Sequence, residues 1–473
     1  MRPLSPLRLV GASVASAALT LRRYVTPSAR SQFQKEGSAA AALARDAARW
    51  EGGATSAEMF VKRLEQVAPE SLDLTVPTHN KAAMQCADTL RKLQPSLAHL
   101  CDLRAKLVER KDDVPFFVHL TVILAVSKQH TASLLTPFHC TMVFAVYGEQ
   151  NRLKKKSEHP NGEDFLFTKI EQLEWLFDCN SRGTWSILVV DDGCPNDSGG
   201  LCAKQLVERQ YGNTNVNVVY LKDGIEQKSP ACVGLESTND SRKGGSIQYG
   251  LYEAAKRNNL PDGTVHCVCY TDADLSTHLG QCGLLMNILV RQGLDCAVGT
   301  RRMHDSIMVK GGSRNVRGKL HAYLWKQMMP EIGYVVDTQT AFKGFKAETV
   351  LDITKSLVER KFAFDIELML KTHLRRENSL GQCGIAWIDS EAESQSGDTE
   401  NYVALLRAIA TIYRAYLPAD TWRDEFADFV SGLSVDSFEK LLDNCPKGIA
   451  TRDAADFATY KGVSSADLAA ACR

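Results

Sequence analysis

The 473-residue sequence lacks net charge, Cys-x2-Cys pairs and long apolar runs. Lys plus Arg and Asp plus Glu are both 56, so no overall field favours nucleic acid or an anionic surface as a partner. No apolar segment reaches the roughly 20 residues that a helix needs to cross a bilayer. The sequence therefore predicts neither a nucleic-acid partner nor a transmembrane span.

The 14 cysteines are scattered, and no Cys-x2-Cys pair occurs. The closest two, Cys267 and Cys269, fall within one expected strand, where side chains two apart share a face. Such a pair suits packing better than metal binding. We therefore expect reduced, mostly buried thiols in a reducing compartment.

The first 37 residues differ in composition from the rest of the chain. No acidic residue precedes Glu36, whereas basic residues are spread among Ser, Ala and Thr. This composition is typical of a transit peptide and predicts a mitochondrial or other organellar location. A secretory signal and a disordered tail are the alternatives, and they leave a cytoplasmic or ER-membrane-associated location open.

The rest of the chain divides into three regions by its hydrophobic pattern. Residues 38–137 and 419–473 predict helical regions at the two ends, and residues 138–418 alternate strands with helices. Alternation of this kind predicts an α/β fold, a mostly parallel sheet with helices on both faces. The expected strands are 139–147, 185–190, 216–221, 265–271 and 295–299, and the expected helices are 163–179, 200–211, 245–258 and 279–292.

Two carboxylates, Asp272 and Asp274, follow the expected strand 265–271 directly. Ligands of parallel sheets bind at the carboxyl ends of strands, and Mg²⁺ or Mn²⁺ prefers oxygen ligands, taking one or two carboxylates plus substrate phosphates. The pair is therefore a candidate metal site. Its structural alternative is a cap on the following helix.

Other strand ends carry polar residues as well. Asp191 and Asp192 follow strand 185–190 and could accept N–H groups of a base, although Asp-Gly is also a common turn. Lys243, Gly244 and Gly245 open a helix, where a glycine backbone and a helix N-terminus could hold a phosphate.

Further along, strand 295–299 leads into Arg301 and Arg302, which are well shaped for phosphate oxygens. Residues 337–346 mix polar and aromatic side chains without an amphipathic period. Asp365 lies in an apolar helix start, either as an N-cap or as a general base with a raised pKa.

The order of these segments, DDGCPNDSG, KGGS, DAD, GTRR, DTQTAFKGF and FDIEL, resembles the family 2 glycosyltransferases of the GT-A (Rossmann-like) fold. The dolichyl-phosphate glucosyltransferase and mannosyltransferase branch is the most similar. The resemblance covers about residues 138–418.

The resemblance implies a role for each motif. Asp191 and Asp192 would bind the nucleoside, and Asp272 and Asp274 the metal and diphosphate. Lys243, Gly244 and Gly245 would contact ribose or diphosphate, with Arg301 and Arg302 also on the substrate. The sugar and acceptor side would consist of Asp337, Gln339, Lys343 and Asp365.

We therefore expect an inverting, metal-dependent sugar transfer from a UDP- or GDP-linked donor to a polyprenyl phosphate or a hydroxyl compound. One alternative is a sugar-nucleotide-binding or scaffold protein without activity. A less favoured one is a nucleotidyltransferase, because the loop after the first strand, YGEQNRLKKK, lacks the glycines that such an enzyme needs.

Overall fold

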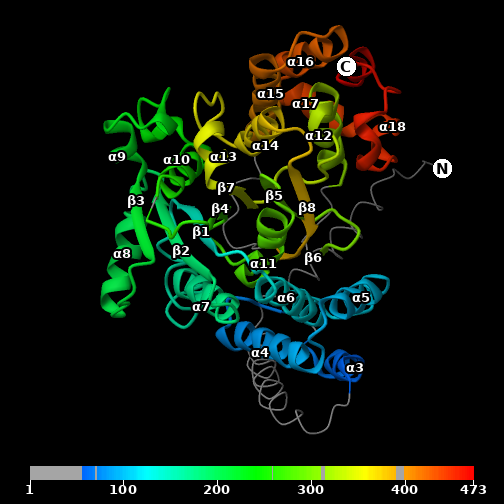
Figure 1. Ribbon diagram of the computed structural model, residues 1–473. Helices are drawn as coiled ribbons and strands as arrows, with labels where there is room; N and C mark the ends of the chain where they lie inside the picture. Colours follow the sequence, from blue (N-terminus) through cyan, green and yellow to red (C-terminus); the bar gives the residue numbers. More distant parts are fainter. Residues whose placement is uncertain (1–55, 70–71, 258, 310–314, 390–398) are drawn as a thin grey trace, which may run out of the picture.

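The computed structural model describes residues 56–69, 72–257, 259–309, 315–389 and 399–473. A seven-stranded sheet lies at its centre, in the order β3-β2-β1-β4-β7-β5-β8 (Figure 1). Its strands are β1 (Phe138–Val146), β2 (Gly183–Asp191), β3 (Val216–Tyr220), β4 (Val265–Thr271), β5 (Cys296–Thr300), β7 (Phe342–Lys346) and β8 (Leu380–Gly384).

All the strand pairs of this sheet are parallel except those of β7, which runs antiparallel to both β4 and β5. A separate parallel pair joins β6 (Ile307–Val309) to β9 (Ala386–Ile388). The predicted α/β class with a mostly parallel sheet is confirmed.

Successive residues of the central strands face two different cores. In β4, Cys267 and Cys269 pack into one apolar cluster, whereas Val268 and Tyr270 pack into the other. Both cysteines are buried and free, as the strand periodicity predicts. A parallel sheet that is apolar on both faces requires helices on both sides.

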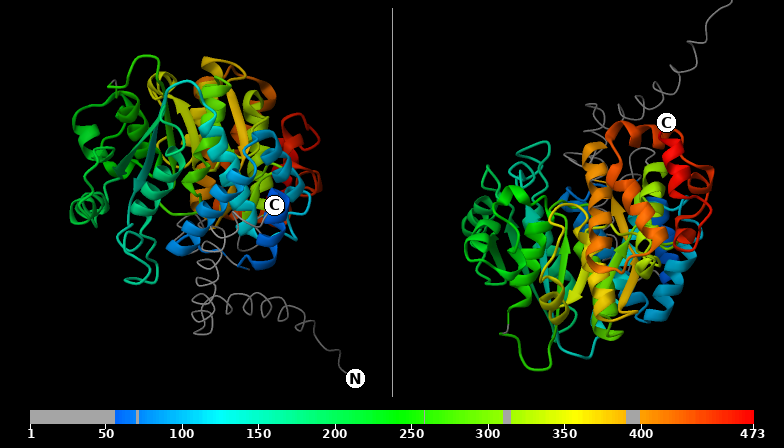
Figure 2. Two further views of the ribbon diagram at one scale, coloured as in Figure 1. Left: turned by 60° about the horizontal axis from the view of Figure 1, so that its bottom comes forward. Right: turned by 90° about the horizontal axis from the view of Figure 1, so that it is seen from above.

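One face is covered mainly by helices from the N-terminal half (Figures 1 and 2). The apolar residues 116–126 belong to a buried helix, α6. The helices of this layer are α3 (Ala57–Val67), α4 (Pro77–Leu93), α5 (Leu97–Val108), α6 (Phe116–Ala132), α7 (Phe165–Phe177) and α11 (Cys282–Met286).

The opposite core is built by helices from the middle and the end of the chain. It includes Phe426, Phe457 and Leu468 from the C-terminal residues. The helices that contribute are α9 (Leu221–Glu226), α10 (Gly244–Ala255), α12 (Asn315–Met328), α13 (Ala347–Ile353), α14 (Phe364–Arg375), α15 (Thr399–Tyr416), α16 (Thr421–Gly432), α17 (Val435–Asp443), α18 (Lys447–Ala450) and α19 (Ser465–Ala471); α8 (Ser198–Glu208) packs beside β2 and β3.

Both helical end regions therefore share a core with the sheet. The boundaries predicted near residues 138 and 419 stay predictions, and the predicted targeting segment 1–37 lies outside the described residues.

The five predicted strands and four predicted helices lie within a few residues of the observed elements. Residues 279–292 form a short 3-10 turn, the helix α11 and a π-helical turn, Asn287–Arg291, rather than one regular helix. Four strands were not predicted: β6, β7, β8 and β9.

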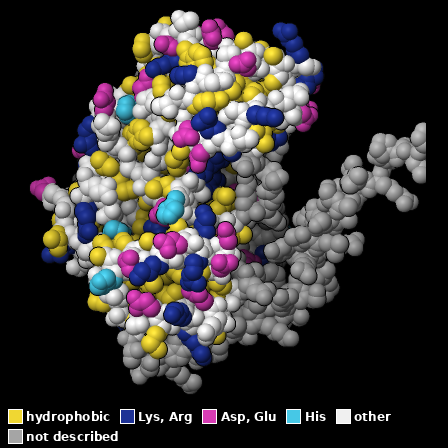
Figure 3. Space-filling view, turned by 90° about the vertical axis from the view of Figure 1, so that its right-hand side faces the viewer, with side chains coloured by type: hydrophobic (Ala, Val, Ile, Leu, Met, Phe, Trp, Pro, Cys, Tyr) yellow, Lys and Arg dark blue, Asp and Glu magenta, His cyan; other side chains and the backbone are white. Residues whose placement is uncertain are grey.

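The surface matches the balanced charge of the sequence. On the face seen in Figure 3, basic and acidic side chains are interspersed. In the described part, no helix combines the length and apolar character required for crossing a bilayer.

Candidate active site

The sheet topology brings the predicted site segments to one edge. The parallel strands β1, β2, β4 and β5 present their carboxyl ends together, and the loops after them carry the candidate residues. Because β7 is antiparallel, its first residue, Phe342, pairs with Thr271, the last residue of β4. The segment before β7, 337–341, therefore lies at the same edge as Asp272.

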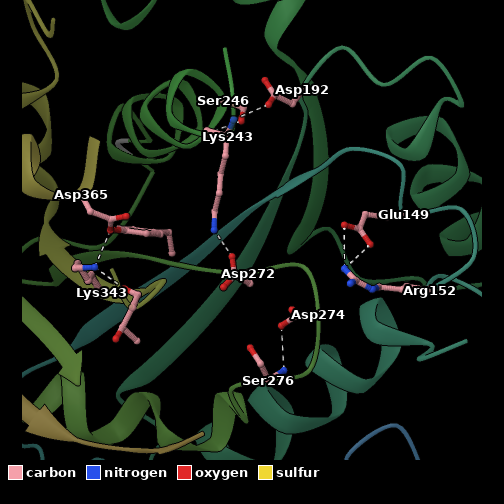
Figure 4. Close-up of polar contacts among 12 residues, drawn as sticks. Glu149, Arg152, Asp192, Lys243, Ser246, Asp272, Asp274, Ser276, Lys343 and Asp365 are labelled. Atoms are coloured by element: carbon pink, nitrogen blue, oxygen red, sulfur yellow. Dashed lines mark hydrogen bonds and ion pairs between the residues drawn. The ribbon is translucent and has the colours of Figure 1, made fainter. Parts of the chain in front are cut away.

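Asp272 forms an ion pair with Lys243 across this edge (Figure 4). Lys243 is the N-cap of α10 and has a left-handed backbone, with φ of 76°. Burial opposes the charge on each partner, but their mutual attraction raises the pKa of Lys243 and lowers that of Asp272. Both side chains stay about one-third exposed, 33% and 36%, so a ligand can reach the pair.

Asp274 is held by its own loop and by the layer beneath it. Its Oδ1 accepts a hydrogen bond from Ser276 N at 3.0 Å, and its carbonyl oxygen accepts one from Lys169 Nζ at 2.8 Å. Glu163 accepts from the next amide, Leu275 N, at 3.1 Å. Burial, and then the nearby Asp274 charge, raise the pKa of Glu163 to about 7.

Lys169 and Glu163 are residues that sequence reasoning did not identify. Lys169 is fully buried on α7, among apolar side chains. It belongs to none of the sequence motifs. The only signal was a charged residue at an otherwise core-facing helical position.

The two carboxylates after β4 fit a hard divalent cation that takes most of its ligands from a bound diphosphate. Within the described ranges, no three His, Cys, Asp or Glu side chains converge as an all-protein metal cage. Two partly exposed carboxylates are the donor set that Mg²⁺ uses when phosphates complete its shell. The ion pair with Lys243 also shows that a cation fits against Asp272.

The two carboxylates at the carboxyl end of β2, Asp191 and Asp192, have different surroundings. Asp191 accepts hydrogen bonds from Cys194 N at 2.8 Å and Gly199 N at 2.7 Å. It therefore stabilises its own loop and the start of α8, as the turn alternative expects. A nucleoside contact by Asp191 stays a prediction.

Asp192 is the better candidate for a ligand contact. Its Oδ2 accepts from Lys243 N at 2.9 Å, whereas its Oδ1 is buried and has no hydrogen-bond partner among the described residues. Burial raises the pKa of Asp192 to about 6. An acceptor in this state suits the N–H group of a base.

The glycines after Lys243 serve the packing of the chain. A Cβ on Gly244 would lie 2.5 Å from the Lys361 carbonyl oxygen, and Gly245 N donates to the Arg360 carbonyl oxygen at 2.9 Å. The backbone that approaches this turn closely is thus the 360–361 segment of the protein itself. A phosphate contact by Gly244 or Gly245 stays a prediction, and Lys243 is the part of the motif that faces Asp272.

A second lysine–aspartate pair lies deeper in the same edge (Figure 4). Lys343, on β7, is fully buried, and its Nζ lies 2.7 Å from Asp365 Oδ1. Tyr270 of β4 donates its hydroxyl to the same oxygen. The N-cap of α14 is Ala363, so Asp365 is not the helix cap that the sequence allowed.

Arg301 and Asp337 form a third ion pair beside these two. The Arg301 guanidinium holds the buried Asp337 in two bonds, Nε to Oδ2 at 2.8 Å and Nη2 to Oδ1 at 3.0 Å. Burial alone would raise the pKa of Asp337, but Arg301 and the Thr340 hydroxyl lower it well below its usual range. The ion pair therefore favours the charged form of Asp337, whose oxygens also accept from Gln339 N and the Thr340 hydroxyl.

Gln339 and Arg302 point to a cavity next to this pair. Its volume is about 250 Å³, and both residues line it. The Gln339 side-chain nitrogen is buried without a hydrogen-bond partner among the described residues. The predicted acceptor-side residues are thus brought together around Arg301.

No protein-family model matches the chain, and no curated protein matches it. Among solved structures, the chain is similar to glucosyl-3-phosphoglycerate synthase from Mycobacterium tuberculosis. The complex with phosphoglyceric acid has 15% identity and a TM-score of 0.40, covering 63% of this chain and 86% of that one. The complex with Mn²⁺, UDP and glucosyl-3-phosphoglycerate has 14% identity, a TM-score of 0.40 and the same coverage. At these values the likeness adds nothing to what the sheet and the site residues indicate.

Proposed function

We propose that this protein is a glycosyltransferase that moves a sugar from a nucleotide-diphosphate donor to an acceptor. The observation that carries the proposal is the meeting of Asp272, Asp274 and Lys243 at the carboxyl edge of the sheet, beside the buried Lys343–Asp365 pair. Charges of both signs are in place there for a diphosphate and for an acceptor group. The order of the sequence motifs supports the same reading.

On the donor side, Asp192 Oδ1 is buried without a partner among the described residues and could accept an N–H group of the base, and Asp192 Oδ2 accepts from Lys243 N at 2.9 Å. Lys243 Nζ supplies a positive charge that a diphosphate can take over from Asp272. Asp272 and Asp274 would hold Mg²⁺ or Mn²⁺. A cation bound there would neutralise the negative charge that develops on the leaving diphosphate.

The transfer itself is one displacement in this proposal. An acceptor oxygen forms a bond to the anomeric carbon while the bond from that carbon to the diphosphate breaks, and the electron pair leaves with the diphosphate. If the acceptor is a hydroxyl, its proton passes to Asp365. If the acceptor is a phosphate, no base is needed, and Asp365 orients it.

The geometry of Asp365 limits that role. Both of its described partners, Lys343 and Tyr270, contact Oδ1. A base therefore acts through Oδ2. Replacement of Asp365 by Asn keeps an acceptor for both partners and removes the base, so a hydroxyl acceptor gives a large loss of kcat, whereas a phosphate acceptor gives a small one.

A donor screen tests the proposed function directly. Purified full-length protein is incubated with UDP- and GDP-sugars and Mn²⁺, and released UDP or GDP is measured. The proposal is supported if UDP or GDP is released from one donor and this release is lost in Asp274→Ala. Absence of release with every donor, in a protein whose melting temperature rises with UDP and Mn²⁺, favours the inactive sugar-nucleotide-binding protein instead.

A further inference from the structure

We infer that the cavity between Arg301, α12 and α15 is an anion site that binds the phosphate or carboxylate group of a compact acceptor. The identity of the bound molecule as an acceptor rests on the proposed function. The anion site itself rests on the contacts of the cavity residues. It names a substrate class that the motifs leave open.

Three arginines surround the cavity. Arg301 and Arg302 come from the loop after β5, and Arg317 comes from α12. Asp337 neutralises Arg301. Neither Arg302 nor Arg317 has an ion pair with a carboxylate among the residues that the structure describes. Two guanidinium groups therefore line the cavity without an ion-paired carboxylate among the described residues, and the Asp337 charge acts on Arg302 as well as on Arg301.

The two arginines differ in how firmly they are held: Arg302 is exposed beside Gly318, whereas Arg317 packs on an aromatic ring. A Cβ on Gly318 would lie 3.0 Å from Arg302 Nη2, so the glycine leaves room for that guanidinium against α12. The Arg317 guanidinium lies over the ring of Tyr402, 5.3 Å from its centroid. The Tyr402 hydroxyl donates to the Arg317 carbonyl oxygen at 2.8 Å. The Arg317 guanidinium, packed against this ring, loses less entropy on binding an anion than an arginine without such a contact.

Unpartnered polar atoms line the same cavity. His321 is 6% exposed, and its Nε2 has no hydrogen-bond partner among the described residues. The Gln339 side-chain nitrogen is in the same state. Burial, and then Arg302, lower the pKa of His321 to about 3, so the imidazole is neutral. Buried polar groups normally have partners, and a bound anion would supply one here.

The position and size of the cavity select the acceptor over other anions. Neither Asp272 nor Lys243 lines it, so the donor diphosphate proposed for that edge lies elsewhere. Its volume of about 250 Å³ holds a compact anionic group but no polyprenyl chain. A neighbouring cavity of about 560 Å³ shares Phe362, Asn401 and Leu405 with it and leaves space for the remainder of the acceptor.

Inorganic phosphate is the probe that tests this site. Its binding to the full-length protein is measured by calorimetry, with and without saturating UDP and Mn²⁺. We expect phosphate to bind in both conditions, and Arg317→Gln to weaken it about tenfold, because the variant loses a charge-assisted hydrogen bond to the anion. Gln339→Met removes a second polar group that lines the cavity and should also weaken binding.

Two controls sharpen the result. Arg317→Lys keeps the charge and should restore most of the affinity, and Lys204→Gln removes one positive charge from the exposed surface of α8 and should change nothing. Unchanged phosphate affinity in both Arg317→Gln and Gln339→Met, or absence of phosphate binding, overturns the anion site.

Competition between phosphate and UDP also overturns it, because the phosphate then occupies the donor site. Failure of UDP and Mn²⁺ to bind contradicts the proposed function instead, while the phosphate comparison without UDP still decides the anion site.

Discussion

Two lysine–aspartate pairs lie at the same edge of the sheet and differ mainly in their access to water. In the Lys243–Asp272 pair, the side chains are 33% and 36% exposed, whereas in the Lys343–Asp365 pair they are 0% and 7% exposed. Water screens the first pair and lets it exchange partners, but the second pair cannot separate without leaving a buried charge. The same two residue types therefore suit an exchangeable ligand contact in one place and, in the other, a fixed position for the Asp365 carboxylate.

The largest expected effect is on the buried pair. Lys343→Met leaves Asp365 as an uncompensated buried charge, and we expect the free energy of unfolding to fall by about 3–5 kcal/mol. Urea denaturation measures it. The double variant Lys343→Met with Asp365→Asn removes both charges and should recover most of the loss. A double variant no more stable than the single one contradicts this account.

The next effect separates activity from stability at Asp274. Asp274→Ala should reduce sugar transfer at least about a hundredfold, because one of two metal ligands is lost, while stability falls by only about 1 kcal/mol. Initial rates and thermal melts measure the two. Asp420→Ala is the matched control, since Asp420 also accepts one backbone N–H, from Arg423, at 3.0 Å. Equal activity in the two variants would contradict the metal role.

A third effect concerns pH and Asp192. Its pKa is about 6 in the folded protein against an ordinary value of 3.8, so the folded state holds this proton more tightly than the unfolded one. That contribution to stability is fully present below pH 3.8 and is lost as the pH rises through 6. Asp192→Asn cannot ionise and should lack this loss.

The difference in the free energy of unfolding between wild type and Asp192→Asn should therefore grow as the pH rises from the ordinary pKa to the raised one. The growth is about 1.4 kcal/mol for each pH unit that separates the two pKa values. Urea denaturation at several pH values between 4 and 7 measures it. A difference that stays constant with pH indicates that Asp192 is solvated in the folded protein.

The smallest effect completes the comparison. Lys243→Met should change the free energy of unfolding by at most about 1 kcal/mol, because exposed ion pairs contribute little. The same denaturation assay as for Lys343→Met measures it. A loss as large as that of the buried pair shows that water does not distinguish the two pairs.

The sequence predicted the elements with a strong local signal. β4 and the two carboxylates after it were located because a run of β-formers ends directly at Asp272. β7 was not predicted, since FKGFK is short, contains two lysines, and is buried only because it pairs with strands on both sides. The close contact at Gly244 was expected at a ligand, but the contacting backbone comes from residues more than a hundred positions away.

The sequence by itself determined the alternation of strands and helices and the kind of residue that follows each strand, because these depend on hydrophobic period and on turn chemistry. The tertiary structure alone decided which charges became partners. Lys343 lies 22 positions from Asp365, and Lys243 lies 29 positions from Asp272. Lys343 reaches Asp365 from β7, which inserts antiparallel between β4 and β5, whereas Lys243 reaches Asp272 from the start of α10, which packs on β1 and β4. No local pattern encodes either arrangement.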